Sequence, residues 1–464
     1  MSHPPSVVIS RLLNDLGYSY ENIVERQRHF AALASMNDSM QITVCGSKRE
    51  GTTLPLENDV DCMVIFSHVE CFDTEEGLRN STTPIKFMLT GYRNTAPGYA
   101  LLQLTSLQDS DIVEFIHKCL VEIDGGYFLS SDDLKQQYKE GTRTASFLPG
   151  NLGIITTCRD NQGPSSPTTL MNGLISNDNV IAFQCNCRHF IAAWSHRRRP
   201  HDWPSRELIN EVSSLQAHVV PVGYKGSPVQ FLEWRICFTL GEICLIESLN
   251  ECQIKLIILL KMIAKEELKP ICQEMSSYVM KNLVLWLAES FPSLIFQEYN
   301  LMKLLNNSLK LLKHCIINRR LPSYMIEERN LFADRITDIE AIQLCEKIDT
   351  CLREGPKMLL RCPKIRNGLN MFRKHPVEFN ILSEYRQLLL SIILKAGQLM
   401  NHRSKELIRK KAMFTAEDVV RLGMESNEDD EIYNDILCPD LAMLIGRGAD
   451  IMQIVLRRLK YILS

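Results

Sequence analysis

A short loop of small residues, followed by two acidic residues one position apart, constrains this chain more than any other feature. Gly46 and Ser47 precede Asp59 and Asp61, and the apolar run 62–66 follows directly. Residues i and i+2 of a strand point to the same face of its sheet, so we expect the two carboxylates side by side. The apolar run favours a central strand over a solvated sheet edge. A glycine loop lets backbone N–H groups approach phosphates, so the pattern predicts metal-dependent phosphate chemistry.

Length and composition restrict the class of protein. The chain has 464 residues and a formal net charge of -3, which indicates more than one domain or one bilobed unit. Because the chain as a whole is not a polycation, any nucleic-acid affinity must come from a local basic face. The most apolar segment, residues 256–262, is interrupted by Lys261 and is too short to span a bilayer, so we expect no membrane association.

The cysteines and the N-terminus indicate a cytoplasmic protein. The 16 cysteines are mostly scattered singly through the chain. Residues 1–8 lack the basic-then-apolar pattern of a secretory signal, so we expect reduced, buried thiols in an intracellular protein. No four-cysteine metal pattern is present, and no structural zinc is expected.

Hydrophobic periodicity divides the chain near residue 240. The first half reads as an α+β arrangement, with helix over residues 1 to about 40, strands at 41–45, 59–66 and 180–183, short β-like runs over 80–130, and a loop at 161–169. The second half reads as long amphipathic helices with proline breakers between several of them. The helices are expected at 249–267, 276–290, 301–317, 336–352 and 378–400, with an acidic loop at 425–431 before a final helix ending at Ile462.

Five segments in a fixed order carry a family resemblance. They are Gly46-Ser47-x-x-Glu50-Gly51 with Asp59-Val60-Asp61, Asp202-Trp203-Pro204-Ser205, Val219-Val220-Pro221-Val222-Gly223, Glu233-Trp234-Arg235-Ile236-Cys237-Phe238-Thr239, and Ser277-Tyr278-Val279-Met280-Lys281-Asn282. Together they resemble the nucleotidyltransferase family named after the male-abnormal (Mab) proteins. The intact acidic pair makes the chain similar to cyclic GMP–AMP synthase and the animal synthase-like receptors within that family.

The resemblance implies a fold, an activity and a biological setting. The fold is a bilobed α+β nucleotidyltransferase with a mixed β-sheet core and flanking helices, divided into a core at residues 1–235 and a helical lobe at residues 236–464. The activity is ligand-activated synthesis of a cyclic dinucleotide from ATP and GTP or other nucleoside triphosphates, in innate antiviral sensing. A nucleic acid such as double-stranded RNA, or another foreign ligand, is the implied activator, and Mg²⁺ or Mn²⁺ is the implied metal.

The resemblance also assigns the catalytic residues. Asp59 and Asp61 supply two metal ligands, and Asp178, just before the 180–183 strand, supplies the third. Two metals held by carboxylates activate a hydroxyl and stabilise departing pyrophosphate. Asp178 also begins an Asp-Asn dipeptide, which is common in turns, so a structural role stays open for it. Gly46 and Ser47 would cradle phosphates, with Glu50 orienting their loop.

Nucleotide contacts are implied in the second half of the chain. Lys261 and Ser277 would contact the triphosphate and Tyr278 would stack on a base, although an exposed helix lysine and a core tyrosine are the plainer interpretations. Arg235 would read an acceptor base, because a guanidinium offers paired donors. Thr239 and Glu242 lie on the same stretch and would assist it. The family often has serine where Cys237 stands, which leaves the base preference open.

Basic residues mark a possible nucleic-acid surface. The densest run is Arg197, Arg198 and Arg199, and a second group is formed by Lys303, Lys310, Lys313, Arg319 and Arg320. Such patches neutralise duplex phosphates, but most charge runs are simply solvated faces. The His/Cys zinc insertion of the vertebrate DNA sensor is not visible. Cys185-x-Cys187-x-His189 is spaced more tightly than structural zinc sites, so we interpret its thiols as small buried side chains.

Two other functions remain compatible with the sequence. One is a catalytically silent scaffold or regulator of the same fold, although loss of the acidic pair would mark such a protein and the pair is intact. The other is a nucleotidyltransferase that extends RNA ends without cyclising the product.

Overall fold

The computed structural model describes the first four fifths of the chain, with gaps. The described residues are 4–36, 40–54, 59–91, 95–108, 112–143, 157–158, 166–170 and 175–374. The helices expected at 378–400 and before Ile462, and the acidic loop at 425–431, lie outside these residues.

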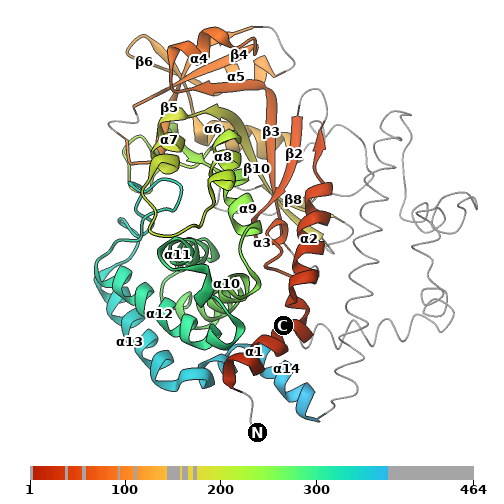
Figure 1. Ribbon diagram of the computed structural model, residues 1–464. Coiled ribbons are helices and arrows are strands. Elements are labelled where there is room, and N and C mark those ends of the chain that lie inside the picture. The colour runs from red at the N-terminus through yellow and green to blue at the C-terminus, as the bar shows by residue number, and fades with distance from the viewer. Residues whose placement is uncertain are drawn as a thin grey trace, which may run out of the picture.

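All the described strands lie before residue 238, together with several helices, and the rest of the described chain is built of long helices (Figure 1). The strands are β1 (Ser35–Met36), β2 (Met40–Cys45), β3 (Asp59–Phe72), β4 (Ile85–Thr90), β5 (Tyr99–Leu107), β6 (Leu120–Ile123), β7 (Gly126–Leu129), β8 (Thr157–Cys158), β9 (Ser166–Leu170), β10 (Ile175–Asn186), β11 (Ala217–Val220) and β12 (Glu233–Cys237). Helices of the first half are α1 (Pro5–Leu13), α2 (Tyr20–Ala32), α3 (Gly46–Arg49), α4 (Glu75–Asn80), α5 (Val113–His117), α6 (Ser131–Arg143), α7 (Arg188–His196) and α8 (Arg206–Ser214). The second half contributes α9 (Thr239–Glu247), α10 (Glu251–Ile263), α11 (Ser277–Ser290), α12 (Leu301–Ile317), α13 (Asp338–Glu354) and α14 (Pro363–Lys374).

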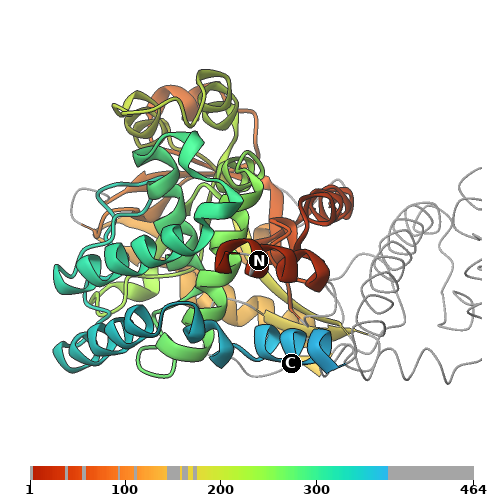
Figure 2. The same ribbon diagram turned by 60° about the horizontal axis from the view of Figure 1, so that its bottom comes forward.

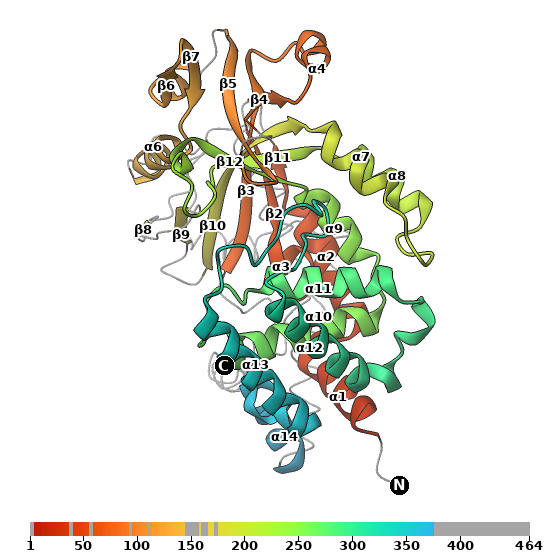
Figure 3. The ribbon, with the colours of Figure 1, turned by 90° about the vertical axis from the view of Figure 1, so that its left-hand side faces the viewer.

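The strand pairings of the sheet close on themselves around an aromatic core. β3 pairs in parallel with both β4 and β10, and the ring runs β3–β4–β5–β12–β11–β10 and back to β3 (Figure 3). Phe183 lies at the centre of the core, with ring centroids 5.2 Å from Trp234 and 6.0 Å from Phe66. β3 has 14 residues and also pairs with β2. The first residues of β3, Asp59 to Asp61, lie at one end of the sheet.

α10 is the central helix of the second half. It begins with a capping box, in which the Asn250 side chain accepts from the Gln253 backbone and the Gln253 side chain accepts in return. Residues 252–260 are all buried, which explains the apolar segment at 256–262 as a helix packed on every side. Within the described residues, none of the helices combines the length and apolar character needed to cross a membrane.

The N-terminal helices contact both halves of the chain. α1 packs against α12 and α14, as Figure 2 shows near the N-terminal end, and Lys255 Nζ donates to Ser10 Oγ at 2.8 Å. α2 instead packs against α3 and β2. The expected division after residue 235 falls inside β12 (Glu233–Cys237).

Two expectations about local structure were wrong. The helical segment expected to residue 40 ends at Ala32, and Ser35–Met36 form β1 by pairing with β2. The loop expected at 161–169 overlaps β9 (Ser166–Leu170), which pairs antiparallel with β10. In both cases hydrogen bonds to a neighbouring strand override a local composition typical of helix or turn.

Candidate active site

Gly46 places the start of α3 directly against Asp61. β2 ends at Cys45, which is the register partner of Asp61 on β3. Gly46 follows with φ +66°, and a Cβ added there would lie 2.0 Å from Asp61 Oδ2. Only glycine fits, because both the backbone conformation and the space exclude a side chain. The glycine-serine loop and the second acidic residue are therefore in contact, as the sequence pattern suggests.

Asp178 lies beside Asp61 on the neighbouring strand. β10 runs parallel to β3 with Asp178 as the register partner of Asp61 and Ser176 as that of Asp59. Register partners on adjacent strands present their side chains to the same face. Asp178 belongs to a strand of 12 residues, so it is not part of a turn.

The donor set fits a divalent cation such as Mg²⁺, which prefers carboxylate oxygens. The side chain of Asp59 lies outside the described part of the structure. Among the described residues, no group of three His, Cys, Asp or Glu side chains is close enough to hold a metal ion. The fit therefore rests on Asp61 and Asp178, which share one sheet face.

The loop formed by residues 46–54 is held on one side by α2. The buried Arg26 donates to Gly51 O at 2.8 Å and to Gly17 O at 2.7 Å, and Gln27 Nε2 donates to Glu50 O at 3.1 Å. Sequence reasoning missed these two residues. Their one signal in the sequence is that they lie within the apolar stripe of α2. An arginine is seldom buried in such a stripe unless it has a partner.

Lys261 holds the same loop from the side of α10. Its Nζ donates to Ser47 Oγ at 2.9 Å, to Thr52 Oγ1 at 3.1 Å and to Thr53 Oγ1 at 3.2 Å. All its hydrogen-bond acceptors are neutral oxygens, and none of the ion pairs among the described residues includes it. Burial lowers the pKa of Lys261 from 10.5 to about 8, because desolvation disfavours the charged form.

Lys281, one turn after Tyr278 on α11, anchors Glu50. Its Nζ donates to the Glu50 carboxylate, and both side chains are buried. Burial alone would lower the pKa of Lys281, but Glu50 and Glu242 outweigh it and hold the pKa above its ordinary value. Glu50 thus orients the loop through an ion pair. We did not assign Lys281 from the sequence, although it belongs to the Ser-Tyr-x-x-Lys segment.

Tyr278 and Glu242 meet where α9 and α11 approach each other. The Tyr278 hydroxyl donates to Glu242 Oε1 at 2.8 Å. Burial, with a further contribution from Glu242, raises the pKa of Tyr278 to about 12. Ser277, the first residue of α11, is exposed, while Thr239 begins α9.

Arg235 lies on the sheet face that carries the acids. Cys237 pairs with His218 on β11, and His218 pairs with Gln184 on β10. Because alternate residues share a face, Arg235 and Asp178 lie on the same face as this row. One apolar cluster lines that face: Met63, Ile65, Ala182 and Val220, with Cys45, Val180, Val222 and Cys237 packed against it.

The arginine run after α7 is largely structural. Arg197 donates to Glu289 Oε2 at 2.8 Å, and Arg199 Nε lies 3.2 Å from the same oxygen. The Arg197 guanidinium stacks over Trp286, and only Arg198 of the run is exposed. Two members of the predicted nucleic-acid surface, Arg197 and Arg199, thus have their guanidinium groups paired with Glu289, and Arg198 is the exposed member.

The second basic group is mixed in the same way. Lys313 forms an ion pair with Asp349, and Arg319 forms one with Asp338. Lys303 and Lys310 are exposed on α12.

The cysteine-histidine segment lies at the end of β10. Cys185 and Cys187 are buried, and His189 is exposed on α7. A hydrogen bond with Cys187, together with burial, raises the pKa of the Cys185 thiol, so the thiol form is favoured.

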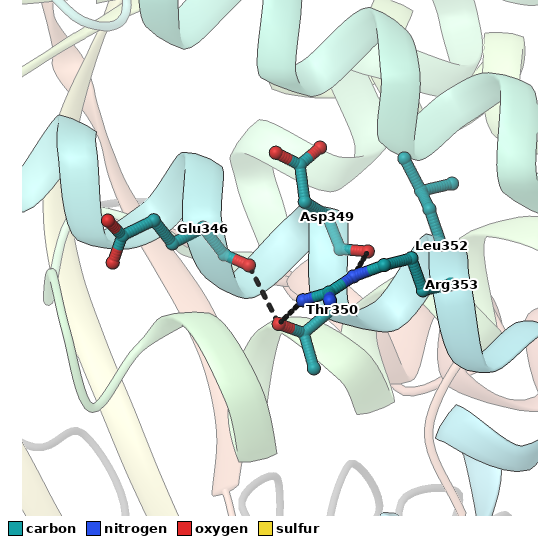
Figure 4. Close-up of a pocket in the computed structure, with 5 residues that line it drawn as sticks. All are labelled: Glu346, Asp349, Thr350, Leu352 and Arg353. Carbon is teal, nitrogen blue, oxygen red and sulfur yellow. Dashed lines mark hydrogen bonds between the residues drawn. The ribbon is translucent and has the colours of Figure 1, made fainter.

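A surface hollow lies elsewhere, on α13. It is about 700 Å³ in volume and is lined by Glu346, Asp349, Thr350, Leu352 and Arg353 (Figure 4). Arg353 donates to Thr350 Oγ1 at 3.1 Å within the same helix. The hollow is formed by one helix and contains none of the acidic or loop residues above.

A comparison with protein families matches one segment of the second half of the chain. Residues 252–350 match the Mab-21 protein HhH/H2TH-like domain. The chain therefore contains a segment that matches the C-terminal domain of the Mab-21 family. This family is part of the nucleotidyltransferase superfamily that resembles cyclic GMP–AMP synthase, which supports the general nucleotidyltransferase assignment. The matched segment contains Lys261, Tyr278 and Lys281, whereas the acids lie outside it.

Proposed function

We propose that this protein is a bilobed, ligand-activated nucleotidyltransferase that makes a cyclic dinucleotide from nucleoside triphosphates such as ATP and GTP. The observation that carries the proposal is the seating of Gly46 against Asp61, with Asp178 as the register partner of Asp61. A backbone loop next to carboxylates is what a triphosphate with its cation requires, because the loop donates N–H groups while the acids bind the metal.

The loop and the helices would bind the donor triphosphate. Ser47 and the backbone after Gly46 donate to phosphate oxygens, and the Lys261 ammonium, 2.9 Å from Ser47 Oγ, supplies a charge opposite to that of the phosphates. The Tyr278 ring is fixed by its hydroxyl contact with Glu242 and would stack on the donor base. Ser277 is exposed at the start of α11 and would contact the triphosphate.

Asp59, Asp61 and Asp178 would hold Mg²⁺ or Mn²⁺, which would stabilise the charge of the attacking oxygen and of the leaving pyrophosphate. Asp178, on the strand next to Asp61, would favour deprotonation of the attacking ribose hydroxyl. Arg235 lies farther along the same sheet face and would orient the acceptor base, with Thr239 and Glu242 assisting. A second transfer in the same site would close the ring.

The biological setting is proposed from the family likeness. Cyclic dinucleotides act as second messengers in innate antiviral sensing, and double-stranded RNA is the first activating ligand to test. Arg198, Lys303, Lys310 and Arg320 are the exposed members of the two basic groups, so binding of a duplex would depend on them and weaken with salt.

The test is a product screen. Wild-type protein is incubated with Mg²⁺, radiolabelled ATP and GTP, and double-stranded RNA, double-stranded DNA or no ligand. The proposal predicts a phosphatase-resistant product with one ligand, absent in Asp61→Asn and Asp178→Asn, and unchanged in Asp349→Asn on α13. No product with any ligand would contradict the proposal and favour a silent scaffold, whereas a ladder on an RNA primer would favour extension of RNA ends.

A further inference from the structure

Several buried polar atoms among the described residues have no hydrogen-bond partner, and two of them are neighbours on the sheet face that carries the acids: the Tyr99 hydroxyl and the Arg235 Nε. Tyr99 on β5 is the register partner of Arg235 on β12, so both side chains lie on one face next to each other. Tyr99 is only 2% exposed. A buried hydroxyl without a partner is costly, so an unpaired one beside an unpaired guanidinium nitrogen indicates a ligand position.

The Tyr99 ring is held firmly although its hydroxyl is unpaired. Its centroid lies 5.5 Å from that of Tyr224 in an edge-to-face contact. The Tyr224 hydroxyl, in contrast, donates to Asp334 Oδ2 at 2.7 Å. Of these two touching tyrosines, Tyr224 has a hydrogen-bond partner for its hydroxyl within the protein and Tyr99 has none.

Arg329 covers the other side of Tyr99. Its guanidinium carbon lies 5.6 Å from the Tyr99 ring centroid. Its side chain runs along Gly98, where an added Cβ would lie 3.0 Å from Arg329 Cδ. Among the described residues, no side-chain hydrogen bond or ion pair uses the Arg329 guanidinium. Tyr99 is therefore clamped between strand β12 and the segment after α12, with cations on both sides.

We propose that the Tyr99 hydroxyl is a specificity-determining contact for the purine base of the second nucleoside triphosphate. This inference rests on the proposed nucleotidyltransferase function. A guanidinium only donates, so Arg235 suits the N7 acceptor that all purines present. A phenol both donates and accepts, so Tyr99 suits the group at purine C6, whether it is the oxygen of guanine or the amino group of adenine.

The chemistry predicts which nucleotides depend on Tyr99. GTP and ATP carry a hydrogen-bonding group at C6, whereas purine riboside triphosphate carries only hydrogen there. Tyr99→Phe removes the hydroxyl and keeps the ring that packs on Tyr224 and Arg329. It should weaken binding of GTP and ATP about tenfold and leave purine riboside triphosphate unchanged.

The test measures binding by calorimetry with Mg²⁺ and nucleotides that carry a methylene bridge between the α- and β-phosphates, so no transfer occurs. Binding at the position of the second nucleotide is recognised as the binding event that disappears in Arg235→Met. Tyr224→Phe is the matched control, since its hydroxyl has Asp334 as a partner, and it should bind all three nucleotides as wild type does.

Three results would overturn the inference: unchanged GTP and ATP binding in Tyr99→Phe, an equal loss for purine riboside triphosphate, or the same loss in Tyr224→Phe. If wild type forms product while any of these holds, only this inference fails. If no nucleotide binds to wild type, the inference and the proposed function fail together.

Discussion

The two paired arginines after α7 and the lysine Lys261 on α10 are cations in opposite environments. Arg197 and Arg199 share the carboxylate of Glu289, and Arg197 also stacks on Trp286. Lys261 contacts only hydroxyl and carbonyl oxygens of the loop that begins at Gly46. The two arginines have a counter-ion, Glu289, within the protein. Lys261, in contrast, presents a desolvated ammonium next to a candidate phosphate loop.

The difference shows that the density of basic residues is a poor guide to a phosphate site. The arginine run is the densest basic cluster in the sequence. Two of its members nevertheless bind Glu289 near the end of α11 and thereby connect that helix to the end of α7. Lys261 is one of two lysines in a mostly apolar helix, yet its pKa is lowered by burial to about 8. A perturbed cation beside carboxylates and a glycine loop is the better indicator of function.

The largest expected effect is on the acidic side of the candidate site. Asp61→Asn keeps the shape of the side chain and removes its charge, so product formation should fall about a thousandfold or more, by analogy with loss of an essential catalytic group. Thermal unfolding should change little. Product formation close to wild type in this variant would remove the acids from the mechanism.

Gly46→Ala tests the contact that carries the proposal. The added methyl group would meet Asp61 Oδ2 at 2.0 Å in a left-handed backbone, so the loop must move. We expect activity to fall about a hundredfold and the free energy of unfolding to fall by roughly 1–3 kcal/mol, measured by denaturant titration. Gly226→Ala is the control, because it shares a positive φ (+87°) but meets no atom within 4 Å. Equal activity in the two variants would contradict the account.

Much of the fold, but less of the site, was predictable from the sequence. Local periodicity located α11 and α12 to within one residue, because a buried helical stripe repeats along the chain. The closure of the sheet and the pairing of Lys281 with Glu50 were not predictable, because they join residues far apart in the sequence. The same holds for the binding of Arg197 and Arg199 to Glu289, which a local charge count cannot reveal.

Glu289→Gln tests the structural side of the comparison. Removing the charge of this buried carboxylate leaves Arg199 without its counter-ion and Arg197 with only the more distant Glu327, 3.9 Å away, so we expect a loss of about 3–5 kcal/mol in the free energy of unfolding. The turnover of the folded fraction should change little. If denaturant titration finds the free energy of unfolding unchanged, the ion pairs of Arg197 and Arg199 with Glu289 do not stabilise the fold as their contacts indicate.

Lys261→Met should have the smallest effect on the free energy of unfolding. It should raise that free energy, whereas Glu289→Gln should lower it. Because the folded pKa is about 8 and the unfolded value 10.5, the unfolded state binds more protons between these pH values. The free energy of unfolding of wild type should therefore rise as pH increases from about 8 towards 10.5, relative to the variant. Denaturant titrations of both proteins across this range check the sign, and a parallel pH dependence would contradict it.

Nucleotide-dependent stabilisation tests the central claim most directly. Melting temperatures of wild type, Lys261→Met and Glu289→Gln are measured with and without Mg²⁺ and a methylene-bridged triphosphate. The account predicts that the nucleotide stabilises wild type and Glu289→Gln alike, while Lys261→Met is at least as stable as wild type without nucleotide and gains little from it. A Lys261→Met protein that is destabilised without nucleotide, yet gains as much from it as wild type, would show that Lys261 is structural and contradict the claim.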